Sequence, residues 1–285
     1  MGQRPYGAAR AAPRNRRSMI HPTAVIHPGA RLDPSVQVGP HAVIDGHVVL
    51  GAGCVIGPHA YLTGLTTIGV NNRFHAGCVI GDAPQDLKYR DEPTGLSIGD
   101  DNVFREHVTV HRSNKCGEPT VIGSHNYLMA AAHVGHNSVV GNHVIMVNGS
   151  MLAGHVTVDD GALLSGNCGV HQFVRVGALA LMQGNSGISQ DLPPFTISRG
   201  INGLAGLNVI GLRRAGVTRE QRLELRKAYH ILFHGAGRLC ERIEKARPEC
   251  PGPFSRQLID FVASTKRGIC STKGSRRTGT AAGES

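Results

Sequence analysis

Four histidines stand close together in the middle of the chain: His133, His136, His155 and His171. An unperturbed imidazole titrates near pH 6.5, so a neutral ring can serve as a general base at neutral pH. Gly154 precedes His155, and a glycine leaves its backbone N–H uncovered for a developing oxyanion. These residue types suit a general base next to an oxyanion-binding donor, provided that the fold brings them together.

The element that must position them is a period of six residues. Stepping in sixes from Ile20 to Ile188 gives 29 positions, of which only Asp86, Glu92 and Cys116 are not large and apolar. No helix or coiled coil has this period, whereas a solenoid of short repeats does. The sequence therefore predicts a solenoid in which each repeat buries its apolar residue against its neighbours.

The composition of the six-residue repeat indicates a triangular prism with three short strands in each coil. A glycine often follows the apolar residue, as in Ile56-Gly57 and Val140-Gly141, and we expect these glycines to turn the corners with positive φ. Aromatic residues make up 4% of the chain and Trp is absent, which suits a narrow interior. The pattern resembles that of the hexapeptide-repeat acyltransferases, and this resemblance alone implies a left-handed parallel β-helix, because the usual crossover rule favours right-handed connections.

In a coil of three hexapeptides, residues 18 apart stack about 4.8 Å from each other. His136, Gly154 and Gln172 then form one column, and Asn137, His155 and Phe173 form the next. Because Val134 takes the interior position, His136 points outward beside the glycine. We expect a general base next to an oxyanion donor on the outer wall.

The repeat divides the chain into regions. We expect a basic leader or extension over residues 1–18, a β-helix over 19–200 with loops 82–97 and 112–119, a helical domain over 201–265, and a disordered basic tail over 266–285. Thr218 and Gln221 form a capping box that starts the first long helix of the helical domain. Helices are also expected around Leu239 to Pro248 and from Phe254 to Val262.

The net charge of +10 lies mainly in the tails, which hold +5 and +4, so the body is close to neutral and nucleic-acid binding is not indicated. No apolar stretch is long enough to be a membrane span, and we expect a soluble, cytoplasmic protein. Seven cysteines without a CxxC pair fit a reducing compartment. Cys54, Cys78 and Cys168 occupy the small-residue position of the repeat, so packing explains them.

More specific motifs are His133-Val134-Gly135-His136, Leu152-Ala153-Gly154-His155-Val156, Val170-His171-Gln172-Phe173, Gln85-Asp86-Leu87-Lys88-Tyr89, His111-Arg112 and Leu212-Arg213-Arg214. With these motifs, residues 19 to about 265 resemble the UDP-N-acetylglucosamine O-acyltransferase family of lipid A biosynthesis. The family transfers an R-3-hydroxyacyl chain from acyl carrier protein to the 3-hydroxyl of UDP-N-acetylglucosamine. It needs no metal or other cofactor and works as a homotrimer with active sites between subunits.

The resemblance assigns roles residue by residue. His136 falls on the catalytic base, assisted by Asn137, and the Gly154 N–H falls on the oxyanion donor. The positions that match substrate-binding residues are Gln85, Asp86 and Lys88 in the first loop, His133, His155, His171 and Gln172 around the base, Gly184 at the end of the acyl groove, and Asn208, Arg213 and Arg214 toward the uridine diphosphate.

Three departures stand out. Asn137 replaces the acid that usually follows the base and offers no charge to an imidazolium, so either another carboxylate helps or the base is weaker. Ala215 interrupts the basic run after Arg214, and a one-residue gap between Gly200 and Asn208 leaves the chain-length determinant near Asn202 unassigned.

Four other functions remain open at this point. His-Asn is also typical of the related UDP-3-O-acylglucosamine N-acyltransferase, and a 3-amino sugar is a further possible acceptor. A γ-type carbonic anhydrase shares the β-helix and uses histidines for zinc. A non-catalytic scaffold would use the fold for assembly alone.

Overall fold

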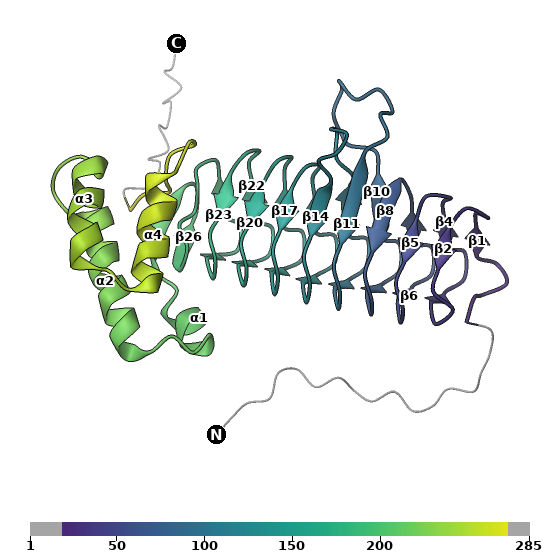
Figure 1. Cartoon of the computed structure of the whole chain (residues 1–285), viewed down its shortest axis with the longest axis horizontal. Coiled ribbons are helices and arrows are strands. Elements are labelled where there is room, and N and C mark those ends of the chain that lie inside the picture. The colour runs from purple at the N-terminus through teal and green to yellow at the C-terminus, as the bar shows by residue number, and fades with distance from the viewer. Residues whose placement is uncertain (1–18, 273–285) are drawn as a thin grey trace, which may run out of the picture.

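The computed structural model describes residues 19–272, and residues 1–18 and 273–285, with the predicted leader and most of the predicted tail, lie outside them. The described chain forms a long prism of short parallel strands with helices at one end (Figure 1). Val25 pairs with Val43 and His133 with Met151, each 18 residues further on. The predicted parallel β-helix with a helical C-terminal region is confirmed.

Three parallel sheets form the faces of the prism, apart from one antiparallel pair at the end. The nine-stranded sheet contains β1 (Val25–Ile26), β4 (Val43–Ile44), β7 (Tyr61–Leu62), β10 (Val79–Asp82), β13 (Thr109–His111), β16 (His133–Val134), β19 (Met151–Leu152), β22 (Gly169–Val170) and β25 (Gly187–Ile188). The eight-stranded sheet contains β2 (Arg31–Leu32), β5 (Val49–Leu50), β8 (Leu65–Ile68), β11 (Gly95–Ile98), β14 (Thr120–Ile122), β17 (Val139–Val140), β20 (Thr157–Val158) and β23 (Arg175–Val176). The ten-stranded sheet contains β3 (Gln37–Val38), β6 (Val55–Ile56), β9 (Arg73–Phe74), β12 (Val103–Phe104), β15 (Tyr127–Leu128), β18 (Ile145–Met146), β21 (Leu163–Leu164), β24 (Leu181–Met182), β26 (Thr196–Arg199) and β27 (Gly203–Leu207).

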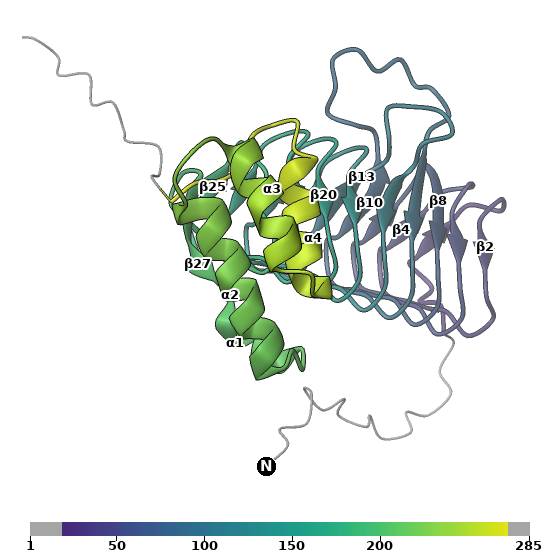
Figure 2. The ribbon, with the colours of Figure 1, turned by 60° about the vertical axis from the view of Figure 1, so that its left-hand side comes forward.

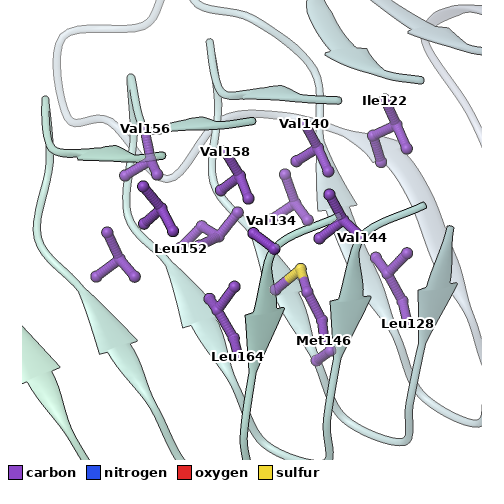
Figure 3. Packing of buried hydrophobic residues seen from close by; sticks show 14 of the residues in the cluster. Ile122, Leu128, Val134, Val140, Val144, Met146, Leu152, Val156, Val158 and Leu164 are labelled. Atoms are coloured by element: carbon purple, nitrogen blue, oxygen red, sulfur yellow. The ribbon is translucent and has the colours of Figure 1, made fainter. Parts of the chain in front are cut away.

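The apolar residues of the repeat fill the interior of the prism. Ile122, Leu128 and Val134 come from three successive faces and meet at its centre, each at most 1% exposed (Figure 3). Phe74 and Phe104 stack with their ring centroids 4.7 Å apart. A core this narrow leaves only the outward residues and the corners free for chemistry.

The corners differ from the expectation. Positive φ occurs at the third residue after the apolar one, and that position is often not glycine: examples are His41, Asp101, Asn137 and Asn167. Asn, Asp and His are the non-glycine residues that most readily adopt this conformation. The repeat therefore favours histidine at its corners for a purely conformational reason.

The glycines that directly follow the apolar residue are needed for close backbone approach instead. A Cβ at Gly57 would lie 2.7 Å from the carbonyl oxygen of Phe74, and a Cβ at Gly69 would lie 2.8 Å from that of Gly99. Both oxygens belong to the next coil, so a side chain would push the coils apart. Glycine is thus required after the apolar residue, as expected, but the predicted reason was wrong: close packing between coils, and not positive φ, requires it.

Both loops leave the prism at the same corner. Residues 83–94 connect β10 to β11, and residues 112–119 connect β13 to β14, so each passes from the nine-stranded to the eight-stranded sheet. The first loop is shorter than expected, because β10 and β11 extend into the range 82–97. Figure 2 shows both loops above this edge.

The C-terminal region starts with a hairpin, β26 and β27, that was not expected, followed by α1 (Val209–Arg214). Next come α2 (Arg219–His234), α3 (Leu239–Glu249) and α4 (Pro253–Ala263), which lie together at one end of the prism (Figure 2). The capping box of Thr218 and Gln221 is present. α3 ends at Glu249, one residue after Pro248 and so near the predicted end.

The segment after α4 is hydrogen-bonded to the prism, so the predicted disorder from residue 266 is wrong for residues 266–272. Asp191 donates its N–H to Gly268 and accepts from Cys270, both at 2.9 Å. The Asp191 carboxylate is almost fully buried and binds Arg175 at 2.9 Å. Within the described residues, no helix is long and apolar enough to cross a membrane.

Candidate active site

His136 and Asn137 form the corner that follows β16. Asn137 has a φ of 60°, so it takes the left-handed position of the repeat. Its side-chain oxygen Oδ1 lies 2.7 Å from Nδ1 of His136 and accepts the backbone N–H of Asn114 at 3.1 Å. The imidazole is therefore held at its Nδ1 edge by Asn137, which the second loop holds in turn.

These contacts determine the tautomer of His136. The backbone N–H of Asn114 can only donate, and the Asn137 amide nitrogen donates to the Ser113 hydroxyl at 2.6 Å, so the atom facing the imidazole is an oxygen. Nδ1 of His136 must then carry the proton. The lone pair is left on Nε2, where a general base needs it.

Gly154 lies directly against this ring. A Cβ at Gly154 would be 2.7 Å from both Cε1 and Nε2 of His136, and the next residue, His155, donates its N–H to the His136 carbonyl oxygen at 2.9 Å. Among the described residues, none accepts a hydrogen bond from the Gly154 N–H. The predicted pairing of an outward imidazole with a bare glycine is present in the structure.

His155 and Phe173 extend the site along the corner. The His155 ring meets His136 edge to face, with centroids 5.3 Å apart, and stacks on Phe173 at 4.6 Å. Burial is the first cause that lowers the pKa of His155, and the neighbouring His136 is the second. Gln172, the third member of the column of His136, is exposed. A neutral His155 can share the site with an imidazolium at lower electrostatic cost.

His133 lies on the outer face of the nine-stranded sheet, one strand from His111. Nδ1 of His133 and the Thr109 hydroxyl are 2.7 Å apart, and the two imidazole centroids are 5.0 Å apart. Burial, followed by the neighbouring histidines, lowers the pKa of His133 to about 4. Burial also lowers the pKa of His111, whose Nδ1 has no partner among the described residues. Both rings are neutral at physiological pH.

The first loop places a carboxylate over the same corner. Asp86 accepts the Asn114 amide at 2.7 Å and the Lys88 backbone N–H at 3.0 Å, and these two bonds are the main causes that lower its pKa. The side chains of Gln85 and Lys88 are exposed on the same loop. The predicted loop residues thus lie at the corner of the candidate base.

An apolar groove of about 500 Å³ runs along the outer face of the nine-stranded sheet. It exists because the outward positions of β22 and β25 hold Gly169 and Gly187, which have no side chains. His133 and His171 both line this groove, so these two predicted residues lie together beside an apolar channel. Arg267, from the C-terminal segment, lies 3.3 Å from Nδ1 of His171.

The remaining predicted residues lie at the other two corners. Gly184 follows β24, between the ten-stranded and nine-stranded sheets. Asn208 donates its amide to the carbonyl oxygen of Leu179, at the corner between the eight-stranded and ten-stranded sheets, and it caps α1. Arg213 and Arg214 are exposed on that helix. One copy of the chain does not bring these residues to His136.

Sequence reasoning missed Asn114 and Ser113 as neighbours of the base. The signal was available, because a loop of known extent between β13 and β14 emerges at the corner that carries His136 one coil later. Stacking by 18 residues fails here, since Asn114 precedes Asn137 by 23 residues. Only a register that allows for the inserted residues aligns the two.

Known proteins share this architecture. A family model described as Udp N-acetylglucosamine O-acyltransferase; Domain 2 matches residues 191–270, and one described as Bacterial transferase hexapeptide (six repeats) matches residues 29–64. An acyl-[acyl-carrier-protein]–UDP-N-acetylglucosamine O-acyltransferase of Syntrophobacter fumaroxidans is 42% identical over 88% of this chain and 98% of its own length. One from Gloeothece citriformis is 46% identical over 70% of this chain and 73% of its own.

This chain belongs to the UDP-N-acetylglucosamine O-acyltransferase family. It is an enzyme of lipid A biosynthesis that transfers an acyl group from acyl carrier protein to UDP-N-acetylglucosamine. The solved UDP-N-acetylglucosamine acyltransferase of Francisella novicida superposes with a TM-score of 0.85 and 32% identity, covering 94% of this chain and all of that one. The solved UDP-N-acetylglucosamine acyltransferase of Bacteroides fragilis superposes with a TM-score of 0.84 and 37% identity, covering 87% of this chain and 98% of that one.

The geometry of the site fits this acyltransferase chemistry better than metal chemistry. The described residues contain no group of three His, Cys, Asp or Glu side chains arranged to hold a metal ion. An imidazole with a free Nε2 beside a free backbone N–H suits attack on a thioester.

Proposed function

We propose that His136 is the general base of the acyl transfer and that the Gly154 N–H stabilises the oxyanion. The observation that carries this proposal is the position of Nε2 of His136, 2.7 Å from where a Cβ on Gly154 would lie, so that the ring sits against a residue without a side chain. Nε2 takes the proton of the attacking sugar hydroxyl while the thioester oxygen becomes negative beside Gly154. Asn137 orients the ring, and Gln85, Asp86, Lys88, His155 and Gln172 contact the sugar nucleotide.

The groove beside His133 and His171 takes the acyl chain of the donor. Its volume of about 500 Å³ and its glycine floor suit a flexible alkyl chain. We propose an R-3-hydroxyacyl chain, as the family resemblance implies, with the 3-hydroxyl of the sugar as the acceptor. His133, neutral through burial, then lies at the end of the groove nearer the base.

The active enzyme is a homotrimer in this proposal. Gly184, Asn208 and the paired arginines of α1 lie at corners away from His136 in one chain, and subunits packed around a threefold axis can bring different corners together. The site then uses His136 and the loops from one subunit and α1 from its neighbour. Sedimentation of the purified protein tests the assembly itself.

A mixing experiment tests the shared site. His136→Ala is combined with Arg213→Ala/Arg214→Ala by unfolding and refolding the two variants together in equal amounts. Random mixing restores about a quarter of the parent activity, since half of the copies supply the base and half of their neighbours supply α1. Recovery of no activity above the sum of the separate variants contradicts a site made by two subunits.

The reaction itself is tested by product mass. The protein is incubated with a panel of acyl carrier protein thioesters and UDP-sugars, with His136→Ala as the control. UDP-N-acetylglucosamine is expected to gain one hydroxyacyl group that mild alkali removes, as it does from an ester. A product that resists alkali, formed from a 3-amino sugar or a glucosamine acceptor, points to the N-acyltransferase alternative that Asn137 suggests.

A further inference from the structure

The candidate base has an amide, and no acid, on its Nδ1 edge. When Nε2 accepts the hydroxyl proton the ring becomes an imidazolium, and Asn137 offers only a carbonyl dipole to stabilise it. The proton later leaves with the thiolate of the donor, so the charge exists only during the reaction. A carboxylate nearby would lower the energy of that charged stage.

The structure contains such a carboxylate, that of Asp86, which is connected to His136 through Asn137 and Asn114. Asn114 donates its backbone N–H to Oδ1 of Asn137 at 3.1 Å and its side-chain amide to Oδ2 of Asp86 at 2.7 Å. The amide must be the donor, because an ionised carboxylate only accepts. His136, Asn137, Asn114 and Asp86 therefore form a continuous chain of hydrogen bonds from the base to the first loop.

The hydrogen bonds of this network do not all point the same way. Nδ1 of His136 and the Asn114 N–H both donate to the Asn137 oxygen, whereas the Asn114 side-chain amide donates to Asp86. The network therefore fixes where the carboxylate lies relative to the ring, and the carboxylate acts on the imidazolium through its charge.

We propose that Asn114 is a positioning residue, which holds the Asp86 carboxylate where its charge stabilises the imidazolium of His136. This inference rests on the proposed role of His136 and names the carboxylate that replaces the missing acid. Asp86 stays ionised throughout and takes no proton. The hydroxyl proton moves only to Nε2 and then to the departing thiolate.

Electrostatics of the loop agree with this arrangement. The Lys88 N–H and the Asn114 amide are the main causes of the lowered pKa of Asp86, and His136 contributes in the same direction. Lys88 itself also favours the ionised carboxylate. On the facing loop, Lys115 and Glu118 act on His155 in opposite directions. The groups around Asp86 on both loops therefore favour its ionised form.

A double-mutant cycle tests the connection, because a direct carboxylate at position 137 makes the remote one unnecessary. Asp86→Asn keeps the shape and removes the charge, and we expect kcat to fall about tenfold, a fraction of the 10²-fold or more due to the base itself. In the Asn137→Asp background the same change is expected to leave kcat within about twofold. The increase in KM for UDP-N-acetylglucosamine should be the same in both backgrounds, since it reports sugar binding.

Asn114→Ala is expected to lower kcat about as much as Asp86→Asn with little change in KM, because the carboxylate remains but is no longer held. Asn114→Ser serves as a second variant that is polar but too short to reach Asp86. Asp91→Asn is the matched control, a carboxylate in the same loop that is exposed and outside the chain of bonds, and it should leave kcat unchanged.

Two results overturn the inference: an equal loss of kcat for Asp86→Asn in both backgrounds, or a parent kcat in both folded Asn114 variants. Assembly and circular dichroism of each variant identify a folding defect. His136→Ala in the same assay separates this inference from the proposed function. If that variant is inactive and the cycle is additive, only the role of Asn114 fails; if it is active, the assignment of the base fails first.

Discussion

Neighbouring histidines occur at several corners of the prism, and the corner of His125 and His143 can be compared with the proposed site at His136 and His155. His125 and His143 take left-handed corner positions after β14 and β17, with their rings stacked 4.9 Å apart and nearly parallel. Both are exposed, and Nδ1 of His125 reaches only the Asp101 carboxylate at 3.8 Å. This pair follows from the conformational preference of the repeat.

The corner of His136 and His155 differs in three respects. Its rings meet edge to face at 5.3 Å, the ring of His136 rests on a glycine, and residues from two loops lie over it. The loops supply Asn114 and Asp86, which no coil of the repeat could place there. The repeat alone thus produces stacked histidines, and in our proposal the two loops add the groups that make the corner of His136 an active site.

The largest expected effect separates the two corners directly. His136→Ala should lower kcat by at least about 10²-fold, because the general base is removed, while assembly stays intact. Steady-state acyl transfer measures the change. His143→Ala, at the corner without loops, is the matched control and should stay within about twofold of the parent. Activity of His136→Ala within a few-fold of the parent would mean that the two corners are equivalent.

The second effect tests the glycine under the ring. Gly154→Ala places a methyl group 2.7 Å from Cε1 and Nε2 of His136, so the imidazole must move, and we expect kcat to fall between about tenfold and 10²-fold. Gly166→Ala is the control at the equivalent position of another corner, where a Cβ would lie 3.6 Å from its nearest neighbour. Equal kcat values for the two variants would show that the contact with Gly154 has no catalytic importance.

The third effect concerns stability and pH at the buried ring beside the site. Burial lowers the pKa of His133 to about 4, whereas the unfolded chain binds that proton near pH 6.5. The unfolded state therefore binds more protons as the pH falls from about 6.5 to about 4, and the folded state loses stability over this window.

His133→Asn should reduce that loss by about 1 kcal/mol, a value that allows for the partial exposure of the ring. The thermal midpoint measured at pH 7 and pH 5 should therefore fall about 2–4 °C less for the variant than for the parent. His125→Asn, at the exposed corner, should follow the parent curve. Parallel curves for His133→Asn and the parent would contradict neutral burial of His133.

The smallest effect is expected at the neighbour of the base. Asn137→Asp should be tolerated or improve turnover, because Asp also adopts the left-handed conformation in this repeat, as at Asp101, and brings a charge to Nδ1. The Ser113 hydroxyl, which now accepts from the amide, can turn to donate to the carboxylate. A complete loss of activity would show that the amide at position 137 has a role that Asp cannot perform.

Much of the site could be predicted, for reasons that particular residues make clear. The period places Val134 inside, so the outward direction of His136 and its stacking on Gly154 follow from counting 18 residues. The hydrogen bond between Asn114 and Asn137 could not be predicted this way, since the loop of residues 112–119 breaks the count. The position of Asn208 could not be predicted either, because its role as the N-cap of α1 depends on where that short helix begins.

By itself, the sequence determined the solenoid, the three-strand coil and the pairing of an imidazole with a bare backbone, because a strict period leaves each side chain one direction to point. The tertiary structure decided which atom of that imidazole is free, which carboxylate lies near it and which predicted residues lie at other corners. Those depend on where two loops fold back and on where the chain places α1, contacts between residues far apart in the chain that no local period encodes.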